Sequence, residues 1–452
     1  MNQLTKRLVH QGLALNQRLS ATAANSVDWL FKRDTLIQSG RTWFELVLDG
    51  DLMSVRYYGL PEEDEIELVD GSHMPVQRQQ YAVPLVLVPP LGVTTETFDL
   101  MPQRSLVRFM AASGFRTYLV DWGKPKKEHA HLNLEDYSYR MLGTALEKVR
   151  KHSGSQDLSM MGWCMGGLLA LFHQGQVRDP SIRNIVTVAS PIDQETALKA
   201  ITGVVGGADI LNGPAQLVSN YANLRLKALD PARLSLPPWA TTLVFKMTDP
   251  VGSVTTYWDL VTRLSDRESL KSYSTTADYL NNMLLYPGGV LKDMVASVVG
   301  ENKLGSGKMT VGDRLAELDT IASNLLAFAG KTDILVPPPV AETIVDIVVS
   351  KDKEFRIAPG GHMGVIIGSK AQNAVWSESV EWLAERSGAT PPAVGSKAGK
   401  AASATVRPKS AGGKAAKAKA KTKAKTKAKP KAAKAKTAKA KRPRKVAPRP
   451  KA

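Results

Sequence analysis

One cysteine lies among glycines in residues 161–167, MGWCMGG, and the chain has no other. An apolar run precedes this segment and the helix-forming stretch LLALFHQ follows it. A nucleophile between two glycines at such a junction is typical of a sharp strand-to-helix turn that exposes the side chain. The helix N-terminus would favour a thiolate at Cys164. The alternative is a small buried apolar residue, which is the commonest fate of a lone cysteine. The surrounding glycines favour the interpretation of Cys164 as a nucleophile.

Two residues further along the chain could complete a catalytic triad. Asp333 follows the apolar run LLAFAG, and His362 follows EFRIA within a glycine-rich turn. A cysteine, then an acid, then a histidine is the chain order that this kind of turn requires. The alternatives are a turn or helix-cap aspartate for Asp333 and a surface-loop histidine for His362. The other six histidines lack a supporting motif, although His129 and His131 lie in a polar loop where they could contact substrate.

Backbone N–H groups should stabilise an oxyanion beside the cysteine. The first expected donor is Met165, the residue after the nucleophile. A second should come from the loop after the first parallel strand, at Gly92 or Val93. No cluster of metal ligands is visible in the sequence, and no cofactor is expected.

The elements that must hold these residues follow from the hydrophobic pattern. Short apolar runs alternate with amphipathic stretches, and this alternation predicts a parallel sheet covered by helices on both faces. With the cysteine turn, it predicts an α/β fold of the α/β-hydrolase kind, with a mostly helical cap insertion and a disordered basic tail. The expected strands lie at 84–90, 116–123, 158–162, 185–190, 325–330 and 354–361, and the expected helices at 99–113, 135–152, 165–177 and 338–350.

The same pattern divides the chain into five parts. The expected parts are an N-terminal helical and hairpin region at 1–80, the first half of the core at 81–190, a cap insertion at 191–318, the second half of the core at 319–387, and a linker with a disordered Lys/Ala-rich tail at 388–452. The first part should hold a helix over residues 1–40 and a hairpin turned at Asp49-Gly50. The helix either packs on the body or sits on a partner or an apolar surface.

Charge is distributed unevenly along the 452 residues. Residues 1–395 carry 38 basic and 42 acidic side chains, whereas residues 396–452 carry 22 basic side chains and no acid. Such a tail cannot build a core and binds polyanions by releasing counterions. We therefore expect nucleic-acid binding by residues 397–452, with a purely solubilising tail or an anionic membrane as alternatives.

Composition excludes several classes of protein. A single cysteine excludes an intramolecular disulfide and suits a reducing cytoplasm. No apolar run reaches the length of a membrane span, so a transmembrane segment is not expected. The first residues lack the apolar core of a signal peptide.

The identity of the nucleophile bears on the reaction. A cysteine forms a thioester, which keeps an acyl group activated toward an alcohol acceptor. A dry pocket beneath an apolar insertion would favour acyl transfer over hydrolysis. A hydrolase with the same three residues remains the alternative, because some hydrolases use cysteine.

The chain resembles the polyhydroxyalkanoate synthase family, nearest to the catalytic subunits of the class III type. The motifs that carry the resemblance cover roughly residues 80–390 and are Pro89-Pro90-Leu91, Val120-Asp121-Trp122-Gly123, Asn133-Leu134-Glu135-Asp136-Tyr137, residues 162–167, Asp333-Ile334-Leu335-Val336-Pro337-Pro338 and Gly361-His362-Met363-Gly364. Residues from about 230 to 300 match the family poorly. The tail instead resembles those of linker histones and granule-associated phasins.

The resemblance implies polymerisation of (R)-3-hydroxyacyl-CoA into polyester with release of CoA. It implies Cys164 as the covalent acyl acceptor and His362 as its base. Asp333 would orient His362 or activate the 3-hydroxyl of the incoming unit. Asp121-Trp122-Gly123 is expected to shape the loop beside the site.

The expected partners and location follow from this resemblance. The partners are the acyl-CoA substrate, the growing polyester granule and a second copy in a homodimer, and the need for a second synthase subunit stays open. The protein would be cytoplasmic and granule-associated, with tethering to the nucleoid through its tail. The remaining alternatives are an esterase or depolymerase, and a non-catalytic adaptor between granule and nucleoid.

Overall fold

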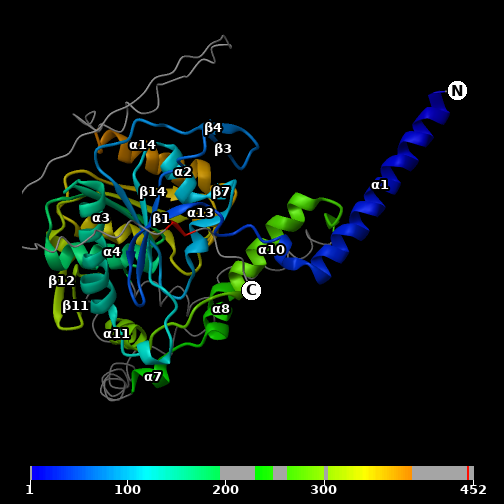
Figure 1. Ribbon diagram of the computed structural model, residues 1–452. Coiled ribbons are helices and arrows are strands. Elements are labelled where there is room, and N and C mark those ends of the chain that lie inside the picture. The colour runs from blue at the N-terminus through cyan, green and yellow to red at the C-terminus, as the bar shows by residue number, and fades with distance from the viewer. Residues whose placement is uncertain (1–2, 194–229, 248–261, 300–303, 389–444, 447–452) are drawn as a thin grey trace, which may run out of the picture. The chain divides into compact units, whose positions relative to one another are not determined.

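A mainly parallel sheet forms the centre of the molecule (Figure 1). The computed structural model describes residues 3–193, 230–247, 262–299, 304–388 and 445–446. Within them the sheet order is β14-β13-β10-β9-β5-β8-β2-β1-β15. The parallel strands are β5 (Leu85–Val88), β8 (Thr117–Asp121), β9 (Leu158–Trp163), β10 (Ile182–Val188), β13 (Asn324–Gly330) and β14 (Lys353–Ala358). All six coincide with strands expected from the sequence.

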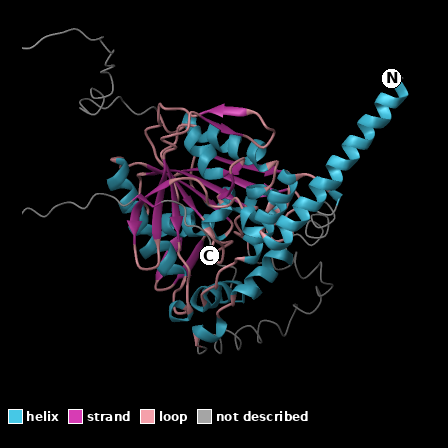
Figure 2. Cartoon of the chain, turned by 45° about the vertical axis from the view of Figure 1, so that its right-hand side comes forward, coloured by secondary structure: helices cyan, strands magenta, loops and turns pink. Residues whose placement is uncertain are grey.

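Successive side chains of these strands point to opposite faces, as the geometry of a strand requires. Leu326 and Phe328 of β13 lie in one buried cluster, and Leu325 and Ala327 lie in the other. The first cluster includes α2 (Leu106–Ala112), α13 (Gly364–Ile367) and α14 (Ser377–Glu385), and the second includes α3 (Leu142–Ser153), α4 (Met165–Val177) and α12 (Pro338–Ile347). Figure 2 shows helices on both sides of the strands. The expected α/β-hydrolase architecture is therefore present.

The antiparallel edge of the sheet holds the expected hairpin. β1 (Phe44–Asp49) pairs with β2 (Ser54–Tyr58), and the turn is closed by Gly50 N–H donating to Met53 O at 3.1 Å. β15 (Lys445–Val446) pairs with β1. The chain divides into two units, Met1–Thr390 with Arg444–Ala452, and Pro391–Pro443. The second unit, and with it most of the tail expected to be disordered, lies outside the described residues.

The expected helix at 99–113 is wrong over its first half. A small hairpin of β6 (Asp99–Met101) and β7 (Arg104–Ser105) comes first, and α2 starts only at Leu106. The buried carboxylate of Asp99 is the physical reason, because it accepts hydrogen bonds from Thr42 Oγ1 at 2.6 Å and Ser105 Oγ at 2.7 Å. A buried charge needs such donors, and they hold this segment in the hairpin.

The cap insertion is helical in its described central part. Its helices are α7 (Pro231–Leu234), α8 (Pro238–Met247), α10 (Arg267–Asn281) and α11 (Gly288–Val299). Its last residues differ from the expectation, because β11 (Lys308–Val311) and β12 (Arg314–Glu317) form a hairpin that packs on α4. Residues 194–229, 248–261 and 300–303 of the expected insertion lie outside the described residues.

The expected N-terminal helix is α1 (Gln3–Phe31). Its C-terminal end contacts the segment at α10, where Arg267 pairs with Asp28 at 2.8 Å and Asn25 Nδ2 donates to Leu264 O at 2.8 Å. Leu15 and Leu19 are 60% and 61% exposed, so this part of α1 does not pack on the body. No helix in the described part of the chain is both long and apolar enough to cross a membrane.

The remaining described elements are short. They are β3 (Glu65–Glu67), β4 (His73–Pro75), the 3-10 turns η1 (Arg33–Thr35), η2 (Thr95–Thr97), η3 (Lys127–His129) and η6 (Leu318–Thr320), and the π-helical turns η4 (Asp136–Met141) and η7 (Gln372–Trp376).

Candidate active site

Cys164 lies in the sharp turn between β9 and α4, with φ +53° and ψ −122°. A positive φ is uncommon for a residue other than glycine, and such strain is typical of an exposed nucleophile at a strand-to-helix turn. The neighbouring glycines are sterically required. A Cβ at Gly166 would lie 2.0 Å from Val88 O, and one at Gly162 would lie 2.4 Å from Gly167 N. The turn therefore fits between β5 and α4 only with glycine at these positions.

The structure brings His362 and Asp333 together. Asp333 follows β13, His362 follows β14, and both side chains are completely buried. His362 Nδ1 lies 2.8 Å from Asp333 Oδ2. A carboxylate only accepts hydrogen bonds, so Nδ1 carries the hydrogen and donates it. The N–H groups of Leu335 and Val336 donate to Asp333 Oδ1 at 2.9 and 2.8 Å, which fixes the carboxylate.

The thiol of Cys164 acts electrostatically on His362. Burial alone lowers the pKa of His362, but the negative charge of Cys164 and the hydrogen bond with Asp333 outweigh it and raise the pKa to about 10. Nε2 of His362 is buried and has no hydrogen-bond partner among the described residues. The raised pKa of His362 means that the imidazole readily holds a proton beside Cys164.

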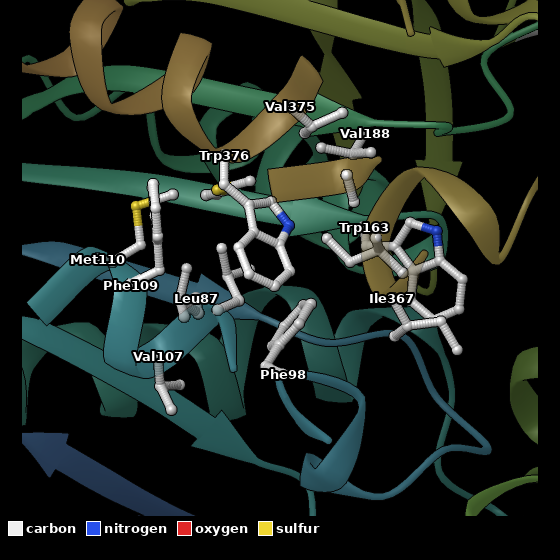
Figure 3. Close-up of a cluster of buried hydrophobic side chains, with 14 of the residues drawn as sticks. Leu87, Phe98, Val107, Phe109, Met110, Trp163, Val188, Ile367, Val375 and Trp376 are labelled. Carbon is white, nitrogen blue, oxygen red and sulfur yellow. The ribbon is translucent and has the colours of Figure 1, made fainter. Parts of the chain in front are cut away.

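Trp163, directly before Cys164, contacts the turn that carries His362. Its indole Nε1 donates to His362 O at 3.2 Å, and the two ring centroids are 5.4 Å apart. Figure 3 shows Trp163 beside Val188 and Ile367 in the buried cluster. Sequence analysis assigned Trp163 no role, although an aromatic residue next to the nucleophile was a signal that could have suggested one.

The expected oxyanion donors lie around the same turn. Met165 is the first residue of α4, where helix geometry leaves its N–H without a partner in the helix. Gly92 has φ +80°, and its carbonyl accepts a hydrogen bond from Leu284 N at 2.8 Å. The N–H groups of Gly92 and Val93 donate no hydrogen bond within the described part of the chain. Within the described residues both N–H groups therefore stay available as the donors that the sequence predicted.

The segment Asp121-Trp122-Gly123 contacts the start of the loop that holds Gly92 and Val93. Trp122 Nε1 donates to Pro89 O at 2.8 Å, and Asp121 Oδ1 accepts from Gly123 N at 2.9 Å. Asp121 also pairs with Arg56 of β2. These contacts agree with the expected role in shaping the loop.

Two of the other histidines, His173 and His131, have partners of their own. His173 is buried in α4, burial lowers its pKa to about 4, and its Nδ1 lies 2.8 Å from Ser138 O. It therefore stays neutral as a structural residue. His131 is exposed, and its Nδ1 lies 2.8 Å from Glu128 O. The described residues hold no group of three His, Cys, Asp or Glu side chains that could bind a metal ion.

Three cap residues contact Trp163 or Gly92, the neighbours of the cysteine turn, and sequence analysis missed all three. Phe245 of α8 packs against Trp163 with ring centroids 6.3 Å apart. Thr241 and Tyr286 pack on Gly92, each with an atom 3.0 Å from the position that a Cβ would occupy there. No local motif marks these residues, because only the fold of the insertion brings them to Trp163 and Gly92.

Comparison with known proteins places this arrangement in a family. A family model described as the alpha/beta hydrolase fold matches residues 84–369. The match covers more than half of the chain, which therefore belongs to the α/β hydrolase fold family. Among solved structures, a soluble variant of monoglyceride lipase from Saccharomyces cerevisiae aligns with a TM-score of 0.46 and 14% identity, over 77% of this chain and 96% of that chain.

Within this family, the chain is related to the poly(3-hydroxyalkanoate) polymerases. It is 28% identical over 309 residues to the polymerase subunit PhaC of Haloferax mediterranei, and this match covers 68% of this chain and 60% of the relative. It is 26% identical over 304 residues to the polymerase subunit PhaC of Allochromatium vinosum, and this match covers 67% of this chain and 81% of the relative. The chain thus spans less than two thirds of the first of these relatives. The predicted resemblance to the polyhydroxyalkanoate synthase family is confirmed by these matches.

Proposed function

We propose that the chain is an acyltransferase that polymerises (R)-3-hydroxyacyl-CoA into polyester and releases CoA. The observation that supports this most strongly is the buried hydrogen bond between Asp333 and His362, an imidazole whose pKa is raised by the charge of Cys164. The polymerase relatives supply the substrate class. No cofactor is required for this chemistry, since the acyl group arrives activated as a thioester.

In the first half of the proposed reaction, Cys164 receives the acyl group. His362 holds the proton of the thiol, and the thiolate attacks the thioester carbonyl. The N–H groups of Met165 and of Gly92 or Val93 stabilise the resulting oxyanion. The bond to the CoA sulfur then breaks, CoA leaves with the proton held by His362, and a thioester on Cys164 remains.

In the second half, a hydroxyl group takes the acyl chain. His362 removes the proton of a 3-hydroxyl group. The oxygen of that hydroxyl group then attacks the carbonyl carbon that is bound to Cys164. The carbon–sulfur bond breaks, the new ester forms, and the proton returns to the Cys164–His362 pair. Asp333 keeps His362 oriented in both steps through the 2.8 Å hydrogen bond.

A hydrolase with the same three residues is the competing proposal, because the family model that matches the chain is described as the alpha/beta hydrolase fold. The test follows CoA release from 3-hydroxybutyryl-CoA together with turbidity from polymer, in wild type and Cys164→Ala. We expect CoA release with turbidity in wild type and neither in the variant. CoA release that yields only free acid would instead establish a hydrolase. Repeating the assay with a candidate second subunit tests whether one is needed.

For the tail we propose binding to nucleic acid. The 22 positive charges after residue 395, without an acid, support this. If about 10 phosphates were engaged, log K would fall with log salt at a slope near −9 on duplex DNA. Gel shifts of the full chain and a chain ending at residue 395 across a salt series test it. Equal retardation of both proteins would refute the proposal.

Association with the granule, homodimer formation and tethering to the nucleoid stay predictions. Each depends on the proposed polymerase activity or on the proposed tail binding. Fractionation of granules from cells that carry the full or the shortened chain would separate these two causes.

A further inference from the structure

A basic loop, residues 123–131, follows β8 at the same edge of the sheet as Cys164. β5 pairs in parallel with β9 on one side and with β8 on the other, so the carboxyl ends of these three strands are neighbours. Cys164 follows β9, the Gly92 turn follows β5, and the basic loop follows β8. Because neighbouring strands are about 4.8 Å apart, the start of the basic loop lies roughly 10 Å from the cysteine turn.

The basic loop carries an excess of positive charge in a body that is otherwise mildly acidic. Its sequence GKPKKEHAH holds three lysines and one acid, whereas residues 1–395 together carry 38 basic and 42 acidic side chains. The net charge of the body disfavours the approach of an anion. A local group of cations at one edge of the sheet therefore determines where an anion binds.

The lysines of the basic loop are available to a ligand. Lys124, Lys126 and Lys127 are all exposed. Lys126 lies 3.8 Å from Glu128, and its side chain is 75% exposed. The side chains of Lys124 and Lys127 form no ion pair with an acid in the part of the chain that the structure describes. Their positive charges can therefore pair with an anion from solution.

The backbone of the basic loop is fixed at both ends. Just before its start, Trp122 Nε1 donates to Pro89 O at 2.8 Å. Near its end, Ala130 O accepts a hydrogen bond from Gly289 N at 2.8 Å, which ties the loop to the first turn of α11. Between these points the 3-10 turn η3 orders the middle of the loop. The lysines are therefore presented on an ordered backbone, which lowers the entropic cost of binding a ligand.

We infer that Lys124 and Lys127 bind the phosphate groups of CoA while its thioester lies at Cys164. This inference rests on the proposed function and deepens it by naming the residues that bind the leaving group. CoA carries a diphosphate and a 3′-phosphate, and a long, flexible pantetheine arm joins them to the sulfur. This arm can span the distance from the cysteine turn to the basic loop. A lysine ammonium binds phosphate as a point charge and needs no fixed fork geometry.

The test compares 3-hydroxybutyryl-CoA with 3-hydroxybutyryl-pantetheine, which has the same thioester and arm but no phosphate. The rate of acylation of Cys164 is followed by mass spectrometry of the intact full-length protein. Lys124→Glu/Lys127→Glu should lower the ratio of kcat/KM for the CoA substrate to that for the pantetheine substrate by about tenfold or more, because two attractions become repulsions. The change should lie in KM, since the phosphates are bound alike before and during acyl transfer. In wild type the same ratio should fall as the salt concentration rises.

Lys151→Glu/Lys351→Glu is the matched control for the change in net charge. Both lysines are exposed. Lys151 lies near the end of α3 and Lys351 shortly before β14, so both lie toward the opposite edge of the sheet, and the ratio should not change. If the variant of the basic loop does not fold, as judged by its thermal unfolding, Lys124→Gln/Lys127→Gln replaces it and should shift the ratio in the same direction. An unchanged ratio in the folded variant, or an equal fall in the control, overturns the inference.

Binding of CoA alone separates this inference from the proposed function. Calorimetric titration of Cys164→Ala with CoA needs no turnover, and adding Lys124→Glu/Lys127→Glu should weaken binding by about tenfold or more. If wild type makes no polymer but CoA binding depends on these lysines, the polymerase proposal is wrong and the role of the lysines stands. If polymer forms but neither CoA binding nor the substrate ratio depends on them, the role of the lysines is refuted and the proposed function stands.

Discussion

The indole Nε1 of Trp163 donates a hydrogen bond to the backbone carbonyl of His362, 199 positions further along the chain. Trp163, which precedes the proposed nucleophile Cys164, therefore holds the turn that carries His362, the proposed base. The same two rings are in contact, with centroids 5.4 Å apart. The position of the Cys164 sulfur relative to the His362 imidazole therefore depends on the contact of Trp163 with the histidine turn, as well as on Asp333.

Replacing Trp163 with phenylalanine tests this coupling. The ring contact is largely kept, but the hydrogen bond to His362 is lost, which is worth about 1 kcal/mol or roughly a fivefold loss in kcat/KM. Trp376→Phe is the matched control, because Trp376 lies in the same buried cluster and its Nε1 has no partner among the described residues. Equal losses of activity in both variants would show that Trp163 only fills space.

Asp333→Asn should inactivate the protein without unfolding it. Two backbone N–H groups donate to Oδ1 of Asp333, so the amide oxygen of asparagine takes that position. Its NH₂ group then faces His362 Nδ1 and forces the hydrogen onto Nε2, which can no longer accept a proton from the thiol. The loss in CoA release should be on the order of 10²–10⁴-fold. Retained activity together with an unchanged melting temperature would contradict the assigned role.

The reactivity of Cys164 should persist at low pH. The pKa of His362 is raised to about 10, because the charge of Cys164 and the Asp333 hydrogen bond outweigh burial. The folded value exceeds the ordinary value of about 6.5, so the stabilising imidazolium is fully present below pH 6.5 and is lost as the pH rises through about 10. Iodoacetamide should therefore alkylate wild type rapidly at pH 6.5.

His362→Gln provides the comparison for this pH dependence. Without the imidazolium, alkylation should rise only as an ordinary thiol ionises, around pH 8.5, and should be roughly 10- to 100-fold slower at pH 6.5. Identical pH profiles for the two proteins would mean that His362 does not hold the proton of Cys164.

Gly166→Ala should destabilise the fold strongly. A Cβ at this position would lie 2.0 Å from Val88 O and 2.8 Å from Pro89 C, and both are backbone atoms that cannot move aside. We expect a loss of about 3 kcal/mol or more in the free energy of unfolding, measured with denaturant. Gly364→Ala is the control, since no atom lies within 4 Å of its Cβ position. Equal stability of the two variants would show that the turn has more room than the structure indicates.

The parts of this molecule that sequence could predict share one physical property. The parallel strands other than β14 are short apolar runs that are largely buried on both faces. Cys164, Asp333 and His362 each come within about four residues of the end of a strand. Strand ends that meet at one edge of a sheet bring such residues together. The pairing of His362 with Asp333 could therefore be anticipated before any coordinates.

The features that sequence did not predict depend on contacts between distant segments. The hairpin at β6 and β7 forms because buried Asp99 needs donors from Thr42 and Ser105, and local pattern in that region favoured a helix. Tyr286 reaches Gly92 only through the path of the insertion. Neither relationship leaves a periodic signal in the chain.

The most direct test of the central claim is mass spectrometry of the protein quenched during turnover of 3-hydroxybutyryl-CoA. We predict a 3-hydroxybutyryl adduct on the peptide that contains Cys164 in wild type, and its loss together with loss of polymer in Cys164→Ala. Polymer made by Cys164→Ala, or an acyl group attached to another residue, would contradict the account.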